Sequence, residues 1–202
     1  DWSARQVVAQ ERDPIRLPPG EYRTYLAPRA LEEVVQLLSW YGAFGRRAHE
    51  TRQTPLLKML VDGATLSPLV SISEDTANGV SANFQSAGFL RPDSVPLIVD
   101  GKFADTLVSP RSAQEYGVPT NGAGDAESPA SVAISPGTLS TASIDEALGT
   151  GLYVGNLWYL NFSDPAACRT TCMTRVATFW MEDGENDAPV ELLRYDETAY
   201  PH

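Results

Sequence analysis

The sequence has few of the side chains that most often build reactive sites. Its 202 residues include two cysteines and two histidines. Cys168 and Cys172 are separated by three residues, a spacing that matches neither the C-x2-C of redox motifs nor most zinc knuckles. The chain opens without a secretion signal, so we expect two reduced thiols that pack as small hydrophobic side chains.

Positive charge and long apolar runs are also scarce. The chain carries 15 Lys+Arg against 26 Asp+Glu, a formal net charge of −11, which would repel an extended phosphate backbone. No apolar run approaches the roughly 20 residues that span a bilayer. The first residues lack the charged-then-apolar pattern of a signal peptide. These features predict a soluble cytoplasmic protein that binds neither nucleic acid nor membrane.

The motifs of several enzyme classes are missing from the sequence. There is no G-x-S-x-G nucleophile elbow, no G-x-G-x-x-G and no Walker pattern. A Cys–His dyad would need His49 or His202 to reach a cysteine, and nothing local would orient that base. A metal site made of both histidines and one or both cysteines would require three remote segments to converge. We therefore expect no cofactor in this chain, with the convergent site as the alternative.

Apolar periodicity predicts one long helix and several shorter ones. The apolar residues Leu31, Val34, Val35 and Leu38 recur at helical spacing between Pro28 and a break at Gly42, which predicts a helix over residues 28–41. Shorter helices are expected over residues 110–116, ended by Gly117, and over residues 140–148. The apolar stretch 54–60 is compatible with either a helical turn or a strand.

The remaining apolar segments are typical of strands. Asp100 and Gly101 supply the two left-handed positions of a type I′ turn, which predicts a hairpin over residues 95–108. Asp183-Gly184 marks a second reversal. Further strands are expected over residues 21–26, 67–73, 131–135, 152–162, 173–181 and 190–194. The predicted fold class is α+β, with a mostly antiparallel sheet, barrel- or sandwich-like, and two or three helices.

Three stretches of the sequence carry a family resemblance: residues 107–122, 151–161 and 173–184. In order and spacing they resemble the C-terminal domain of the TldD/PmbA family, once called modulator of DNA gyrase, whose members are metallopeptidases and their partners. The resemblance extends from Leu17 to Val190. It implies that residues 17–202 form this domain and that residues 1–16 are a linker or helix tail from an upstream domain.

The resemblance also implies where zinc would bind in active relatives. Those peptidases carry a His-Glu-x-x-x-His helix, in which two histidines four residues apart bind zinc, and a later cysteine. Here His49-Glu50 reproduces the first half of the motif, but Thr54 stands in place of the second histidine. In register, the zinc helix corresponds to residues 31–38, which contain no histidine or cysteine. The chain is therefore similar to the metal-less PmbA-like branch, and whether it is an enzyme is left open.

The family resemblance implies a role in proteolysis or maturation of small unfolded peptides. The chain would act as a metal-less or partner subunit, in a homodimer or in a heterodimer with a TldD-like subunit. An extended peptide would bind in a cleft, and Asn121, Gly122 and Asn161 are candidates to line it, with turn formation as their alternative role. The alternative function is a non-catalytic scaffold that dimerises through its strand-rich surface.

Overall fold

A computed structural model of the chain describes residues 7–200. The chain divides by its contacts into two compact units, and the division falls within one helix, between Val35 and Gln36. Unit 1 contains Asp1–Val35, Thr138–Asn161 and Thr170–Glu197. Unit 2 contains Gln36–Gly137, Phe162–Arg169 and Thr198–His202.

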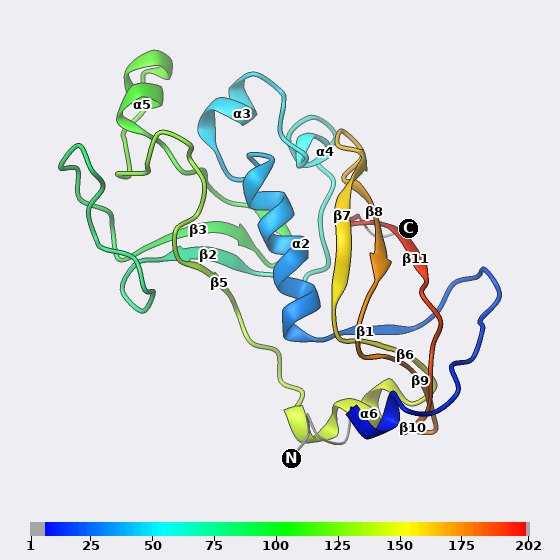
Figure 1. The fold of residues 1–202 in the computed structure, drawn as a ribbon. Coiled ribbons are helices and arrows are strands. Elements are labelled where there is room, and N and C mark those ends of the chain that lie inside the picture. The colour runs from blue at the N-terminus through cyan, green and yellow to red at the C-terminus, as the bar shows by residue number, and fades with distance from the viewer. Residues whose placement is uncertain (1–6, 201–202) are drawn as a thin grey trace. The chain divides into compact units, whose positions relative to one another are not determined.

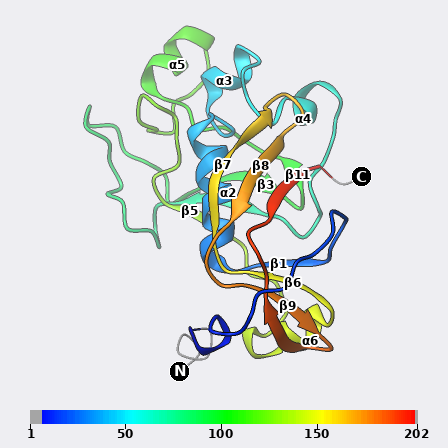
Figure 2. The same cartoon turned by 45° about the vertical axis from the view of Figure 1, so that its right-hand side comes forward.

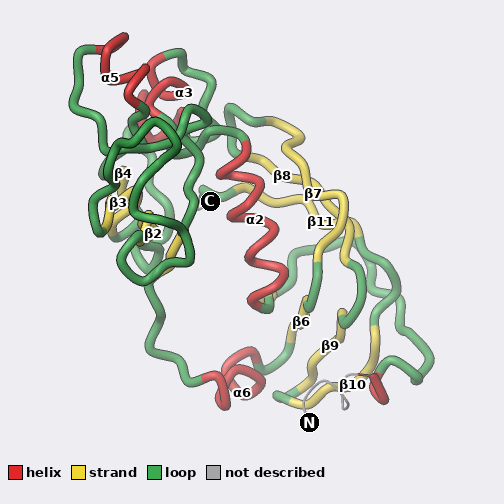
Figure 3. The backbone as a smooth tube through the Cα atoms, turned by 60° about the vertical axis from the view of Figure 1, so that its left-hand side comes forward, coloured by secondary structure: helices red, strands yellow, loops and turns green. Residues whose placement is uncertain are grey.

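The long helix predicted from the apolar periodicity is present as α2, Pro28–Trp40. In Figure 3 it is drawn much longer than the other helices, and the described residues contain four more α-helices of five or seven residues each. These are α3 (Arg46–Glu50), α4 (Leu57–Val61), α5 (Pro110–Tyr116) and α6 (Ile144–Leu148), the last preceded by the 3-10 turn η1 (Thr141–Ser143). Residues 7–9 are also helical.

The ends of α5 show why the local prediction was right there. The Ser109 hydroxyl accepts a hydrogen bond from the Ser112 N–H and so caps the first turn of the helix. Pro110 occupies the first position, where no N–H is needed, and Gly117 ends the helix with φ 66° in the left-handed region. Each of these signals lies within a few residues of sequence.

Eleven strands form three sheets in the described part of the chain (Figure 1). The sheet orders are β1-β6-β9-β10, β11-β8-β7 and β4-β3-β2-β5. The strands are β1 (Thr24–Leu26), β2 (Ile72–Asp75), β3 (Ser94–Val99), β4 (Lys102–Phe103), β5 (Val132–Ile134), β6 (Gly151–Val154), β7 (Leu157–Asp164), β8 (Arg169–Thr174), β9 (Thr178–Glu182), β10 (Glu185–Pro189) and β11 (Arg194–Thr198).

The predicted fold class is confirmed: helices and mostly antiparallel sheets occur together. Strand β1 runs parallel to β6, whereas the pairs β2–β3, β2–β5, β3–β4, β6–β9 and β9–β10 are antiparallel. None of the sheets in the described residues closes into a barrel. The hairpin turn expected at Asp100-Gly101 is present, with φ values of 49° and 74°.

Two long predicted strands are each broken in the structure, which corrects the sequence interpretation. Residues 152–162 divide into β6 and β7, and residues 173–181 divide into β8 and β9, so each run leaves one sheet and enters another (Figure 2). The breaks are joined: the Gly155 N–H donates to the Ala177 carbonyl at 2.9 Å, and the Arg175 N–H donates to the Asn156 carbonyl at 3.1 Å.

Two other strand predictions were wrong in position. Strand β2 begins only at Ile72, because the Val70 N–H donates to the Ser67 carbonyl at 2.9 Å and closes a turn at the point where a strand over 67–73 was expected. Residues 190–193 connect β10 to β11 instead of forming a strand over 190–194. In both cases apolar residues were interpreted as strand although they lie in a turn or connection.

Each unit has its own buried core. In unit 1 one cluster gathers around Tyr153 and Phe179, and a second gathers around Ala30, Val154 and Leu157. The most deeply buried apolar side chains of unit 2 include Phe44, Leu56, Leu97 and Ile98. Among the helices of the described residues, none combines the length and apolar character that crossing a bilayer requires.

Candidate functional site

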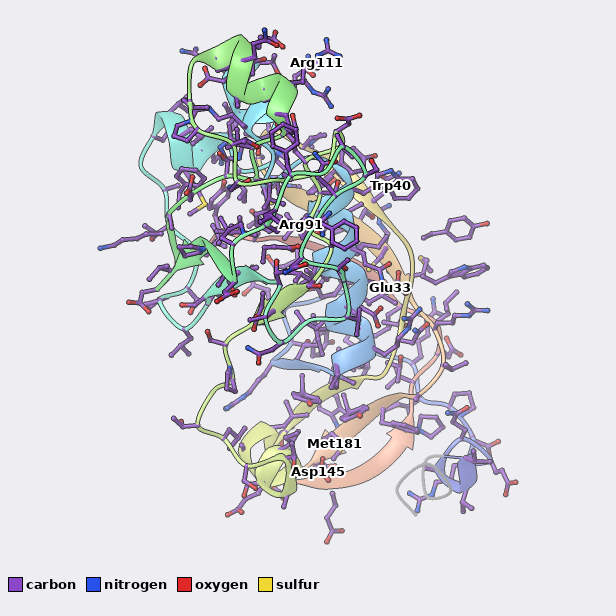
Figure 4. The ribbon with its side chains drawn as sticks, turned by 90° about the vertical axis from the view of Figure 1, so that its left-hand side faces the viewer. Glu33, Trp40, Arg91, Arg111, Asp145 and Met181 are labelled. Carbon is purple, nitrogen blue, oxygen red and sulfur yellow. The ribbon has the colours of Figure 1, made fainter. Side chains whose placement is uncertain are left out.

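Helix α2, which the family resemblance aligns with the zinc helix of active relatives, contains two glutamates and neither histidine nor cysteine. Within α2 the two carboxylates are engaged by a single cation: Arg29 pairs with Glu32 at 2.8 Å and with Glu33 at 3.0 Å. Figure 4 labels Glu33 on this helix. The carboxylates therefore form i,i+3 and i,i+4 surface pairs of the kind that stabilise a helix by a few tenths of a kcal/mol.

His49 and Glu50, the weak match to the zinc motif, lie on α3 and face different partners. The His49 side chain is buried, its Nε2 lies 2.6 Å from the Ala43 carbonyl oxygen, and its ring lies 5.0 Å from that of Phe103. Because a carbonyl only accepts, Nε2 carries the proton in this bond. Burial lowers the pKa of His49. Glu50 forms an ion pair with Arg46.

The residues described by the structure do not fit a catalytic zinc. Residues 7–200 contain no group of three or more histidine, cysteine, aspartate or glutamate side chains arranged to hold a metal ion. His202, part of the alternative site that would need three segments to converge, lies outside the described residues.

The expectation of two packed thiols is confirmed. Cys168 and Cys172 are both free and buried. Burial raises the pKa of Cys168 to about 11 and that of Cys172 to about 12. Since the thiolate is the form that attacks electrophiles and binds metals, burial disfavours the reactive form of both side chains near neutral pH.

Asn121 organises the loop before α5. Its side-chain oxygen accepts a hydrogen bond from the Val108 N–H, and its side-chain nitrogen donates to the Thr106 carbonyl, both at 2.8 Å. The Thr120 hydroxyl adds a bond to the Val108 carbonyl at 2.7 Å. The amide of Asn121 therefore acts as a substitute strand partner for residues 106–108 and holds them extended.

Gly122 allows two loops of unit 2 to approach each other. Its φ is 71°, and a Cβ placed there would lie 2.2 Å from the Leu90 carbonyl oxygen. These contacts match the turn-forming role that the sequence left open for Asn121 and Gly122. Asn161, the third candidate, is an exposed residue of β7 in unit 1, whereas the other two belong to unit 2. Their contact with a peptide stays a prediction.

A small pocket lies beside Asn121, with space for about one water molecule. Its polar lining includes Glu74, whose carboxylate accepts from the Ala130 and Ser131 N–H groups, together with Thr76 and Arg91, the last labelled in Figure 4. The Thr76 hydroxyl and the Arg91 Nε are buried without a hydrogen-bond partner in the described protein. These two groups suit an ordered water, and the pocket is too small for a peptide side chain.

Glu127 is a buried carboxylate that sequence reasoning missed. It is 2% exposed, and it accepts hydrogen bonds from the Arg47 N–H at 2.7 Å and from the Ser109 N–H and hydroxyl at 2.9 Å each. Burial by itself would raise the pKa of Glu127, but the hydrogen bonds from Ser112, Arg47 and Ser109 outweigh burial and lower it. The carboxylate thus joins the first turns of α3 and α5. Its segment has no apolar pattern that could have revealed this role.

A profile of the PmbA/TldA metallopeptidase C-terminal domain matches residues 19–200 of the chain. The chain belongs to this family. The resemblance inferred from the three sequence stretches is therefore confirmed. A search of curated proteins found no match.

Three solved structures share the fold of this family member. A candidate modulator of DNA gyrase from Thermotoga maritima superposes with a TM-score of 0.80 at 17% identity, covering 96% of this chain and 45% of its own. TldE from Thermococcus kodakarensis superposes with a TM-score of 0.76 at 18% identity, and the match covers 98% of this chain and 46% of TldE. A further candidate modulator of DNA gyrase, from Bacteroides thetaiotaomicron, superposes with a TM-score of 0.77 at 14% identity, and the match covers 98% of this chain and 44% of that protein. The chain spans less than half the length of each.

Proposed function

We propose that this domain is the metal-less, peptide-holding part of a TldD/PmbA-type system that processes small unfolded peptides, in which another subunit supplies the catalytic zinc. Its partner would be a TldD-like subunit or a second copy of the chain. This domain would hold the peptide, and the catalytic metal would be bound elsewhere in the assembly.

One observation supports the metal-less role above the others. The family resemblance aligns α2 with the zinc helix, and in α2 the acidic side chains are Glu32 and Glu33, both paired with Arg29, with no histidine or cysteine. Outside α2, the imidazole of His49 is bound to a backbone carbonyl. Catalytic zinc in proteins needs three protein ligands and an open position, and these side chains do not supply them.

The experiment compares metal content and peptide binding of the full chain. Purified protein is dialysed against zinc, its metal content is measured, and binding of a fluorescein-labelled unfolded peptide is followed by anisotropy with and without a chelator. We expect no stoichiometric zinc and peptide binding that the chelator leaves unchanged. Stoichiometric zinc together with chelator-sensitive cleavage would contradict the proposal and make the chain itself the peptidase.

A scaffold role is the second candidate function, and an exposed apolar loop of unit 2 favours it. The Phe84–Leu90 bridge closes a short hairpin on which both side chains are exposed, by 57% and 73%, and Val80 nearby is fully exposed. Exposed apolar side chains gathered on one loop are a feature of interaction surfaces. A stable dimer by light scattering, lost in Phe84→Ser and accompanied by no peptide binding, would support this role over the first.

A further inference from the structure

Unit 1 carries an exposed aromatic pair with an arginine beside it. Trp158 and Tyr159 of β7 are 44% and 73% exposed, and their ring centroids lie 4.4 Å apart with planes tilted by 41°. The guanidinium of Arg175, which follows β8, lies 5.0 Å from the Trp158 ring centroid. We call these three side chains the aromatic platform; β7 and β8 are neighbours in their sheet (Figures 1 and 2).

The backbone at the platform is strained. In a regular strand, consecutive side chains point to opposite faces of the sheet, so neighbouring rings do not meet. Tyr159 has φ 52°, in the left-handed region, and its ring contacts that of Trp158. This conformation is unfavourable for a residue with a side chain, because the Cβ crowds the following carbonyl oxygen. Strain of this kind gathers at functional sites.

The platform stands on a rigid support. Leu157, next to Trp158, is 2% exposed in the core of unit 1. The backbone of Arg175 is held by the bond from its N–H to the Asn156 carbonyl at 3.1 Å, and its guanidinium lies over the Trp158 ring. The second bond between the two strand breaks involves Ala177, itself left-handed with φ 56°. The backbone that carries the rings and the cation is therefore ordered before any ligand arrives, which lowers the entropic cost of binding.

The charge of the platform selects an anionic ligand. Within residues 7–200 no carboxylate forms an ion pair with Arg175, and its contact is the Trp158 ring. Carboxylates outnumber basic side chains in this chain, whose net charge is −11. A guanidinium stacked on a ring still presents N–H donors at its edge, which suit a carboxylate. A polyanion is disfavoured, because the acidic chain repels it and the platform offers one cation.

We propose that the aromatic platform binds the C-terminal end of a short peptide whose last residue is apolar or aromatic. The exposed faces of Trp158 and Tyr159 take the side chain, and the Arg175 guanidinium takes the terminal carboxylate. The ligand class rests on the proposed function, which supplies short unfolded peptides. The platform adds a preference for free, apolar C-termini, which binding through backbone hydrogen bonds alone would not give.

The test compares a labelled peptide ending in phenylalanine carboxylate with the same peptide ending in phenylalanine amide. Binding of both to the full chain is measured by anisotropy. We expect the free acid to bind about fivefold more tightly, as for an exposed charge pair worth ~1 kcal/mol. Arg175→Gln should abolish that preference. Trp158→Ala should weaken both peptides by up to about tenfold.

Matched variants separate the platform from general effects. Arg111→Gln removes the same charge from an exposed position on α5, and Trp40→Ala removes the same ring from a site that is 86% exposed; both are labelled in Figure 4. Neither should change the peptide affinities. Tyr159→Gly should weaken peptide binding without lowering the unfolding midpoint, since glycine adopts positive φ freely.

The possible results distinguish the platform from the proposed function. If the peptide affinity changes neither on amidation of the C-terminus nor in Arg175→Gln, the platform is overturned and the peptide-holding function is left intact. A carboxylate preference in a chain that also binds stoichiometric zinc and cleaves peptide would overturn the metal-less function and keep the platform. No peptide binding at all would overturn both. Displacement of the peptide by a single-stranded oligonucleotide would overturn the peptide as ligand.

Discussion

Removal of the Glu127 charge is expected to destabilise unit 2. In Glu127→Gln one side-chain oxygen becomes an NH2 group, which then faces a donor: the Arg47 N–H at 2.7 Å, or the Ser109 N–H and hydroxyl at 2.9 Å. A hydrogen bond to a charged group contributes about 1.5–3 kcal/mol, and a buried donor left unpaired costs about 1–3 kcal/mol. We expect the free energy of unfolding to fall by about 2–4 kcal/mol, which is a large part of the stability of a typical domain.

Urea unfolding followed by tryptophan fluorescence and circular dichroism measures this loss. Amide hydrogen exchange locates it, because the Arg47 and Ser109 N–H groups should exchange faster in the variant. Glu115→Gln is the matched control: Glu115 lies on α5 at the surface, 4.0 Å from Arg111. Such an exposed pair contributes at most about 1 kcal/mol.

The pH dependence provides an independent check on the Glu127 carboxylate. The pKa of Glu127 is lowered in the folded protein from the ordinary 4.5. The unfolded chain therefore binds the proton more tightly, and the stabilisation is complete above pH 4.5 and lost as the pH falls through the folded pKa. The difference in unfolding free energy between wild type and Glu127→Gln should therefore become smaller as the pH falls through that range. If the unfolding free energy of Glu127→Gln lies within about 0.5 kcal/mol of that of wild type at pH 7, the Glu127 carboxylate does not stabilise unit 2 as described. A difference in unfolding free energy that acid leaves unchanged would contradict the role of its charge.

Three further predictions concern the backbone, the thiols and the core. Gly122→Ala should lower the free energy of unfolding in urea by more than about 1 kcal/mol. Gly137→Ala is the control: no atom lies within 4 Å of the added Cβ, so the free energy of unfolding should hardly change. Cys168 and Cys172 should react with a thiol reagent at pH 8 only after unfolding, since burial raises both pKa values to about 11 and 12; rapid labelling of the native chain would contradict this. Phe179→Ala should cost about 3–5 kcal/mol because that ring is 1% exposed, and a midpoint equal to that of wild type would show that the core of unit 1 is misassigned.

Several elements could be predicted because their causes lie within a few residues. The apolar stripe of α2, the cap and glycine at the two ends of α5, and the Asp100-Gly101 turn each act through neighbouring backbone groups. The family resemblance belongs to the same level, since it needs only the order and spacing of short stretches. From these, the α+β class and the antiparallel majority followed without coordinates.

The candidate sites depended on contacts between remote residues. Glu127 binds N–H groups 80 and 18 positions away, and nothing in its own segment marks it as buried. The structure gives Asn121 and Gly122 backbone partners, and the prediction that they bind peptide stays untested.

Local sequence determined which stretches could become helix, turn or strand, because propensity and capping act over a few residues. Tertiary structure decided where the strands end. Residues 152–162 and 173–181 each look like one strand, yet Gly155 and Ala177 bond across the two breaks and direct each half into a different sheet. The same pairing places Arg175 beside Trp158. Such contacts join segments about 20 residues apart, and no short-range pattern encodes them.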